Sequence, residues 1–242
     1  MIWGDYHIHT IYSGNNGHAS NTPEGILAVA KQKGLKQVGI CDHGLNHMLY
    51  PTTVNRLKKL KDKIDLLNAE QSDVKLLMGI EANIFSSDGE IDLINVDRKM
   101  FDLVVAGFHK MVWTKKLKDG FGFSQLFANV EQAKKKYTSI VISTIKTQKI
   151  DILAHPGYGF PVDIVKIAKV ASDYGVKIEL NGKRINLSDE EVLALAESSV
   201  KIVANSDAHD DNRIGDVSLP INTLNRLGIP LERLSNFNGV LF

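Results

Sequence analysis

The sequence of 242 residues predicts an α/β fold in which a parallel sheet is covered by helices. Three observations support this prediction. Short apolar runs rich in Val and Ile recur along the whole chain, and such continuous runs are typical of parallel strands that are buried on both faces. Segments with helical periodicity separate most of these runs. No linker, repeat or low-complexity stretch divides the chain, so we expect one domain over residues 1–242.

Seven segments have the composition of buried strands. The first is "DYHIH", and the remaining six are similarly short and apolar. The seven segments cover residues 5–9, 37–43, 75–82, 102–109, 151–156, 176–181 and 200–209. Seven strands joined by helices favour a closed or nearly closed barrel, and an open doubly wound sheet is the alternative.

The helix after the first strand has clear start and stop signals. Thr22 is a favourable N-cap residue, and Pro23 is typical of the first helical position. Gly34 is typical of a residue just beyond a helix end. The apolar residues between them share one face: Ile26, Leu27 and Ala30. We therefore expect an amphipathic helix that packs on the sheet.

Four further segments repeat apolar residues at intervals of three and four, the period of an amphipathic helix. In the last of them Ser188 precedes Glu191 by three residues, which is the pattern of a capping box. The expected helices run from Val54 to Leu67, from Phe127 to Ile145, from Val162 to Tyr174 and from Ser188 to Ser199.

Composition narrows the class of protein. The formal charge of +1 and the pI of about 7.8 do not favour a nucleic-acid-binding protein. Cys41 is the one cysteine, so no intrachain disulfide can form, and we expect it to be a small core residue. We find no secretory signal pattern and no apolar segment long enough to span a membrane. The sequence therefore predicts a cytoplasmic protein without a membrane partner.

The first strand carries two histidines one residue apart. In a regular strand, side chains alternate between faces, so Asp5, His7 and His9 are expected to project the same way. The two histidine Cα atoms would then lie about 6.5 Å apart, near enough for both rings to bind one metal ion.

Other metal-type residues also fall at the expected carboxyl ends of strands, where parallel α/β folds place their functional face. Five of the eight histidines end a strand, His209 closely follows one, and Glu81 and Asp207 share this placement. The five are His7, His9, His43, His109 and His155. So many independent coincidences are improbable, so we predict a metal site. Imidazoles with a few carboxylates and no thiolate suit Zn²⁺, Mn²⁺ or Fe²⁺ better than Mg²⁺ or Ca²⁺.

Six motifs together resemble the PHP (polymerase and histidinol phosphatase) family, most closely its small stand-alone bacterial phosphoesterases. The motifs are "DYHIHTIYSGNNGH", "GICDHG", "GIEANI", "AGFHK", "LAHPG" and "NSDAH". They occur in the family's order from Asp5 to about Gly215. The resemblance implies a distorted seven-stranded (β/α) TIM-like barrel with a trinuclear site. The implied ligands are His7, His9, His18, His43, Glu81, His109, His155, Asp207 and His209.

The resemblance also implies how the ligands are shared. Glu81 would bridge two of the three metal ions, and Asp207 would join the two histidines of the first strand on one ion. His18, His43 and His209 would hold the ion set apart from that pair. His18 lies a few residues later in its loop than is common in the family, and His47, which matches no motif, is expected on the surface or behind the ligands.

Four more residues are candidates from their positions alone. Asp5 and Asp42 flank proposed ligands, and a carboxylate behind a ligand histidine fixes its tautomer. Arg184 and Arg213 follow strand ends and are predicted to bind the phosphate of a substrate.

The predicted function is metal-dependent hydrolysis of a phosphoester, most simply a phosphomonoester, by metal-activated hydroxide. The alternatives are a histidinol-phosphate phosphatase, a nuclease that acts on DNA ends, a metal-dependent amidohydrolase and a non-catalytic metal-binding module. Amidohydrolases commonly carry a metal-bridging lysine where this chain has Glu81 and His109. The expected partner is a small phosphorylated molecule.

Overall fold

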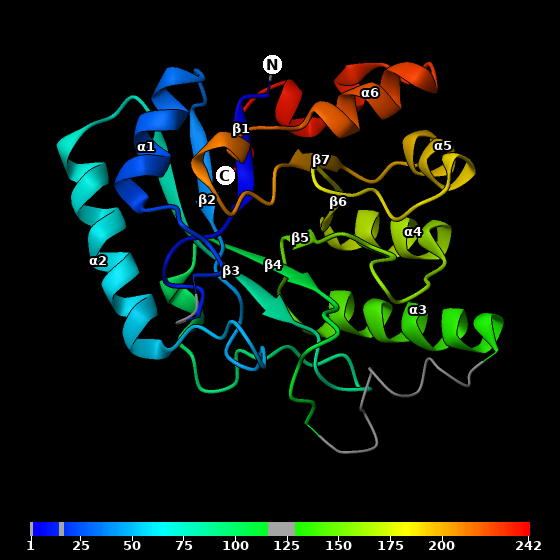
Figure 1. The fold of residues 1–242 in the computed structure, drawn as a ribbon. Coiled ribbons are helices and arrows are strands. Elements are labelled where there is room, and N and C mark those ends of the chain that lie inside the picture. The colour runs from blue at the N-terminus through cyan, green and yellow to red at the C-terminus, as the bar shows by residue number, and fades with distance from the viewer. Residues whose placement is uncertain (1, 15–16, 116–128) are drawn as a thin grey trace.

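The computed structural model describes residues 2–14, 17–115 and 129–242. Its seven strands are all parallel and form one sheet in chain order (Figure 1). They are β1 (Gly4–Ile8), β2 (Gln37–Ile40), β3 (Lys75–Asn83), β4 (Leu103–Gly107), β5 (Ile152–Leu153), β6 (Lys177–Asn181) and β7 (Ile202–Asn205). The α/β fold with a parallel sheet is confirmed.

The two edge strands of this sheet approach each other. Ile8 at the end of β1 forms a parallel bridge with Ala208, just after β7, and the amide of His9 donates to the carbonyl of Ala208 at 2.9 Å. Two residues earlier in β1, the amide of Tyr6 donates to Oδ1 of Asn205 at 2.9 Å. A side chain thus replaces part of the missing ladder, and the sheet forms a nearly closed barrel. This excludes the open doubly wound alternative.

Helices connect most of the strands and pack around the outside of the barrel. In Figure 1, α1 and α2 lie on one side and α3, α4 and α5 on the other. The helices are α1 (Pro23–Gln32), α2 (Val54–Glu70), α3 (Val130–Thr147), α4 (Ile164–Tyr174), α5 (Asp189–Glu197) and α6 (Ser218–Arg226), with short 3₁₀ helices at Arg98–Met100, Asp211–Arg213, Leu231–Arg233 and Ser235–Phe237. The five predicted helices are present, although Phe127, the expected start of one, lies outside the described residues.

The predicted caps form. Oγ1 of Thr22 accepts from the amide of Gly25 at 3.1 Å, and Ser188 and Glu191 make the reciprocal pair of a capping box. The sequence analysis missed α6, which has no side-chain cap and carries Pro220 near its start. Among the described residues, we find no helix with the length and apolar character needed to cross a membrane.

Two apolar clusters stabilise this arrangement. The larger one lies between the sheet and the helices and is rich in Ile, Leu and Val. The smaller one gathers side chains from five of the strands and from the segments just after β2 and β5, so it fills the barrel interior: Tyr6, Cys41, Leu77, Leu103, Val105, Ile152, Ala154 and Val203. Cys41 is completely buried there, as predicted for a core residue. The interior below the carboxyl ends of the strands is therefore packed rather than open.

A bulge interrupts the regular alternation of β1. Its register with β2 shifts between Asp5 and Ile8, which places an extra residue in the ladder. As a result Tyr6 packs in the barrel interior, whereas Ile8, two residues later, packs in the outer core. Residues two apart share a face only in a regular strand. The prediction that Asp5 projects with the two histidines of this strand is therefore wrong.

Candidate metal centre

The nine predicted ligands gather at the carboxyl ends of the strands. His7 lies inside β1 and Glu81 inside β3, and the others follow the ends of β1, β2, β4, β5 and β7. The parallel sheet explains this, because all its strands end at the same rim of the barrel. Most of these side chains are buried, while His18, His155, Asp207 and His209 are partly exposed.

Glu81 is at the centre of the cluster, and both of its carboxylate oxygens face imidazole nitrogens. Oε1 lies 3.2, 3.1 and 2.8 Å from Nε2 of His7, His109 and His155. Oε2 lies 2.7 Å from Nδ1 of His43 and 3.6 Å from Nε2 of His9. Five histidines from four different strand ends thus surround one buried carboxylate, the arrangement expected of a bridging ligand.

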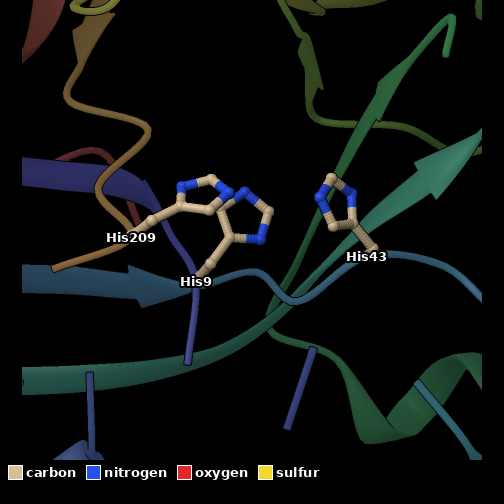
Figure 2. Close-up of side chains that lie close together, drawn as sticks. All are labelled: His9, His43 and His209. Atoms are coloured by element: carbon tan, nitrogen blue, oxygen red, sulfur yellow. The ribbon is translucent and has the colours of Figure 1, made fainter. Parts of the chain in front are cut away.

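Among the described residues, three groups of three side chains each place one ligand atom within 4.8 Å of the others. The groups are His7, His9 and Asp207; His9, His43 and His209; and His43, Glu81 and His109. Figure 2 shows the second group, in which the rings of His9 and His209 lie close together with the ring of His43 across from them. Because the groups share His9 and His43, they are neighbours, and the cluster has donors for more than one ion.

His18 completes the second group from the loop after β1. Its Nε2 lies 2.7 Å from Nε2 of His209 and 3.1 Å from Nε2 of His43. Its ring stacks on Tyr50, with the ring centroids 3.6 Å apart. The structure therefore brings His18 to the place that the family resemblance implies, despite its later position in the loop.

The donor atoms fit divalent transition-metal ions. Nε2 of His18 faces two other Nε2 atoms, and its single proton can satisfy at most one of them. Oε2 of Glu81 and Nδ1 of His43 are buried and 2.7 Å apart but do not meet in hydrogen-bond geometry, and Nδ1 of His109 is buried without a hydrogen-bond partner among the described residues. Buried polar atoms need compensation, and cations among these lone pairs would supply it.

Both carboxylates of the cluster are ionised. Burial raises the pKa of Glu81, but the surrounding histidines, led by His109, outweigh burial and lower the pKa well below 4.5. Burial likewise raises the pKa of Asp207, and His7 and other neighbours lower it well below 3.8. The cluster therefore offers two anionic ligands to balance the charge of bound cations.

Three of the imidazoles are neutral at pH 7. Burial lowers the pKa of His18 to about 3 and the pKa of His209 to about 4, and burial lowers the pKa of His9 well below 6.5. A neutral imidazole keeps one lone pair, which is the form that binds a metal ion.

Two proposed ligands have unusual backbone conformations. The φ angle is +28° at His155 and +52° at Asp207, values that residues with a Cβ rarely adopt. Such conformations cost about 1–3 kcal/mol each and cluster at functional sites. In both cases the turn directly follows a short strand and directs the side chain into the cluster.

A cavity of about 410 Å³ opens above the cluster. Its floor contains Glu81 and several of the histidines, and its walls come from the loops after β2, β4, β5 and β6. Wall residues include Leu49, Tyr50, Lys110, Tyr158, Lys183 and Arg184. The cavity is large enough for a small organic molecule in contact with the metal-type residues.

Comparison with known protein families matches residues 5–190 to the PHP domain. The chain belongs to the PHP domain family. The match ends at the start of α5, so Asp207 and His209 lie beyond it, yet the fold brings both to the same PHP cluster as the matched residues.

Similar proteins include two named "Probable phosphatase". The one from Shewanella piezotolerans (strain WP3) is 30% identical over 246 residues, covering 96% of this chain and 88% of the relative. The one from Shewanella sp. (strain W3-18-1) is 34% identical over 190 residues, covering 76% and 64%. Among solved structures, histidinol phosphate phosphatase from Lactococcus lactis, in complex with zinc, L-histidinol and phosphate, has a TM-score of 0.66 at 15% identity and matches over 94% of each chain.

Behind the proposed ligands lies Glu179 on β6, which the sequence analysis missed. Its Oε1 lies 2.8 Å from Nδ1 of His7, and its Oε2 accepts from the amide of His155 at 2.9 Å. Asn181 and Asn205 donate to the same carboxylate at 3.0 and 2.9 Å. A charged residue inside the apolar run "VKIELN" was the signal for it, because buried acids require partners.

Lys183 is a second residue that the sequence analysis did not identify. Its Nζ lies 3.1 Å from Oδ1 of Asp207 and 2.7 Å from Nδ1 of His209. The contact to His209 leaves Nε2 of that ring for the cluster. Asn181 donates to the other oxygen of Asp207 at 3.1 Å, so both oxygens of this ligand are oriented by β6 and the loop that follows it.

The two predicted supporting aspartates have other contacts than expected. Asp5 accepts from the backbone amides of Ser206 and Gly215 at 3.0 and 2.8 Å. Asp42 accepts from Oγ of Ser13 at 2.6 Å and from the amide and hydroxyl of Thr10, each at 2.6 Å. Neither carboxylate is bonded to a ligand ring, so the expected fixing of a tautomer by Asp5 or Asp42 is wrong. They tie the loops after β1 and β7 instead.

His47 is buried rather than on the surface. Its ring stacks on that of His43 with the centroids 4.7 Å apart, and its Nδ1 accepts from the amides of Leu49 and Tyr50 at 3.3 and 3.1 Å. This agrees with the alternative expectation of a position behind the ligands.

The two predicted phosphate-binding arginines differ in their placement. Arg184 lines the cavity. The guanidinium of Arg213 forms an ion pair with Asp216 and donates to the carbonyl of Gly182 at 3.0 Å. Arg213 does not line the cavity and holds together the loops after β6 and β7, so its role as a substrate ligand stays a prediction from the sequence.

Proposed function

We propose that this PHP protein is a metal-dependent phosphatase that hydrolyses phosphomonoesters at a centre of three divalent transition-metal ions. The observation that carries this proposal is the surrounding of Glu81 by five imidazoles beneath a cavity. Family membership and the names of its relatives agree with it. We further propose that residues 1–242 form one domain, because β7 supplies two ligands from beyond the matched region.

The nine residues named above would hold the ions, with Zn²⁺, Mn²⁺ or Fe²⁺ favoured by the excess of nitrogen donors. When bound, such ions polarise a phosphoryl group and lower the pKa of water, so that hydroxide is available near neutral pH. In the reaction a water oxygen bonds to phosphorus, the bond between phosphorus and the ester oxygen breaks, and the alcohol leaves with a proton.

The chain's own residues would position the reactants. Glu179 holds the ring of His7, and Lys183 with Asn181 holds Asp207, so these ligands need not reorganise during the reaction. The ammonium of Lys183 and the guanidinium of Arg184 both line the cavity. A hydrogen bond from Lys183, whose Nζ lies 3.1 Å from Asp207, would orient the transferred phosphoryl group over the cluster, whereas Arg184 would bind another anionic part of the substrate.

An assay with metal-loaded protein tests the proposal. Hydrolysis of a simple phosphomonoester should disappear with a strong chelator and return with Mn²⁺ or Zn²⁺. His155→Ala should lose most of this activity, because its Nε2 lies 2.8 Å from Glu81. Arg226→Gln is the matched control, since Arg226 pairs with Asp189 on the outside of the barrel. Activity that survives the chelator would contradict the proposal.

The substrate panel should separate the competing activities. Histidinol phosphate tests the activity named for the Lactococcus lactis protein. A single-stranded oligonucleotide tests for nuclease activity, and an amide substrate tests for amidohydrolase activity. If the protein hydrolyses one of these substrates and no simple phosphomonoester, that activity takes the place of the proposed phosphatase activity.

A further inference from the structure

The wall of the cavity on the side of β4, β5 and β6 carries hydrogen-bond donors and positive charge. Lys110 follows His109 at the end of β4, and Arg184 and Asn186 lie in the loop after β6. All three line the cavity. Among the described residues of the cavity wall, the carboxylates are Glu81 and Asp207, both already assigned to the metal cluster. The outer part of this wall therefore has cations without a matching acid.

Lys110 is held in this wall by its packing. Its Nζ lies 5.7 Å from the centre of the Tyr158 ring, within range of a cation–π contact. Its stem lies against Gly159, where a Cβ would collide with Cε of Lys110. Gly159 has a φ of +70°, a conformation that also favours glycine. The loop after β5 thus leaves room for this lysine beside the cavity.

Asn186 provides an independent sign of a ligand at the same wall. Its Nδ2 is buried and has no hydrogen-bond partner among the described residues. Its Cβ and carbonyl lie close to Gly157, in the same loop after β5 that carries Tyr158. A buried amide donor without an acceptor is rare in folded proteins, and a turn of this side chain toward the cavity that Asn186 lines would let it donate to a bound molecule.

Lys183 does not belong to this group. It contacts Asp207 and His209, so its charge is balanced within the metal cluster. Arg184, Lys110 and Asn186 therefore remain for a part of the substrate other than the phosphoryl group over the metals. The opposite wall differs in character, since it presents Leu49 and Tyr50 from the loop after β2.

We infer that the substrate is a phosphomonoester whose alcohol part carries a second anionic group, bound by Lys110, Arg184 and Asn186. This inference rests on the proposed phosphatase function and adds the substrate class to it. A carboxylate or a second phosphate both offer the acceptor oxygens that these donors require. An alcohol part with an ammonium group, such as histidinol, is disfavoured, because it would meet two like charges.

Three phosphomonoesters with similar skeletons test the inference. They are 3-phosphoglycerate, which adds a carboxylate, glycerol 3-phosphate, which is neutral there, and phosphoethanolamine, which adds an ammonium. With Mn²⁺-loaded protein, kcat/KM should be at least about tenfold higher for 3-phosphoglycerate than for glycerol 3-phosphate, and lowest for phosphoethanolamine. Higher salt should reduce this preference, because the outer wall is open to solvent.

Variants test whether Lys110, Arg184 and Asn186 cause the preference for 3-phosphoglycerate. Arg184→Gln and Lys110→Gln should each lower kcat/KM for 3-phosphoglycerate about tenfold and change that for glycerol 3-phosphate less than about threefold. Asn186→Ala should act in the same direction. Arg226→Gln again serves as the control, because its guanidinium lies on the barrel exterior with Asp189.

The outcomes separate the two proposals. Equal rates for the three substrates would overturn the inference and leave the phosphatase function in place. An equal loss for all three in Arg184→Gln would also overturn it, because Arg184 would then contact the transferred phosphoryl group. Hydrolysis of none of the phosphomonoesters tested, with Mn²⁺ or Zn²⁺ supplied, would instead reject the proposed function itself.

Discussion

Oε1 of Glu179 lies 2.8 Å from Nδ1 of His7, and both side chains are almost completely buried. The two residues are 172 positions apart in the chain and meet because β1 and β6 belong to one barrel. The contact leaves Nε2 of His7 directed at Glu81, 3.2 Å away. Glu179 thereby decides which nitrogen of this ring is offered to the cluster.

Glu179→Gln should weaken metal binding by about 10–100-fold per folded molecule. Glutamine keeps the size of the side chain but presents an NH₂ group to neighbours that all donate, namely His7, Asn181, Asn205 and the amide of His155. Competition with a chromophoric chelator measures the affinity, and the folded fraction is checked on the same sample.

The control for this variant is Glu70→Gln at the exposed end of α2. Metal affinity in the control should match that of the unmodified protein. Unchanged affinity in Glu179→Gln, with reduced stability alone, would show that Glu179 has a structural role and does not position His7.

The sequence predicted most of this site because the information is local. Each strand end is visible as the last residue of an apolar run, and a parallel sheet places all such ends at one rim. His43, His109 and His155 were found in this way. His18 lies in a loop, and its place came from the resemblance to the PHP family. Its stacking on Tyr50 shows how the loop is held.

The residues behind the ligands could not be predicted with the same success, since their contacts join distant parts of the chain. The position of Asp5 suggested a contact with a histidine, but the bulge in β1 turns it toward the amides of Ser206 and Gly215. Such a bulge depends on the pairing of two strands and has no clear signal in one of them. The placement of Arg213 likewise depends on a distant contact, since its guanidinium donates to the carbonyl of Gly182 in the loop after β6 as well as pairing with Asp216.

Metal removal should show how many ions the cluster holds. Elemental analysis of gently purified protein should give more than one transition metal per chain, approaching three, because nine ligands exceed the needs of a single tetrahedral site. A ligand present at 100 times its Kd stabilises the folded state by about 2.7 kcal/mol, so a chelator should lower Tm by about 5–10 °C. A single ion at full occupancy would contradict the trinuclear proposal.

The buried carboxylate of Asp92 should make the free energy of unfolding depend on pH, even when no metal is bound. Its carboxylate is buried and accepts from the amides of Asn46 and Asn83, each at 2.8 Å, and from Nδ2 of Asn83 at 2.6 Å. Burial outweighs these hydrogen bonds and raises the pKa of Asp92 from 3.8 to about 6. The folded state therefore holds this proton between about pH 4 and pH 6, where the unfolded chain has released it.

The contribution of Asp92 is consequently fully present below about pH 4 and is lost as the pH rises to about 6. The difference between the two pKa values corresponds to about 3 kcal/mol of unfolding free energy. Urea unfolding of chelator-treated protein across this range measures it. Asp92→Asn should flatten the curve relative to the unmodified protein, whereas Asp62→Asn on the exposed face of α2 should not. Parallel curves for Asp92→Asn and the unmodified protein would contradict the assignment.

Glu81→Gln tests the bridging carboxylate directly. Glutamine keeps the size and hydrogen-bonding capacity of the side chain but removes the negative charge and one metal-binding oxygen. Both oxygens of Glu81 face imidazole nitrogens, so the loss affects two metal positions rather than one. Without the charge, two cations a few ångströms apart would repel each other with less compensation.

We therefore expect Glu81→Gln to lose at least one metal ion per chain and to lower kcat by about two orders of magnitude, or roughly 3 kcal/mol of transition-state stabilisation. Metal stoichiometry and rate must be measured on the same folded preparation, because lost metal also lowers thermal stability by mass action. A purely structural Glu81 would give the opposite pattern: a lower Tm with unchanged metal content and an unchanged kcat per folded molecule. Because the two oxygens of Glu81 face imidazoles of different proposed metal positions, at 2.7 Å from Nδ1 of His43 and 2.8 Å from Nε2 of His155, we expect the loss of metal.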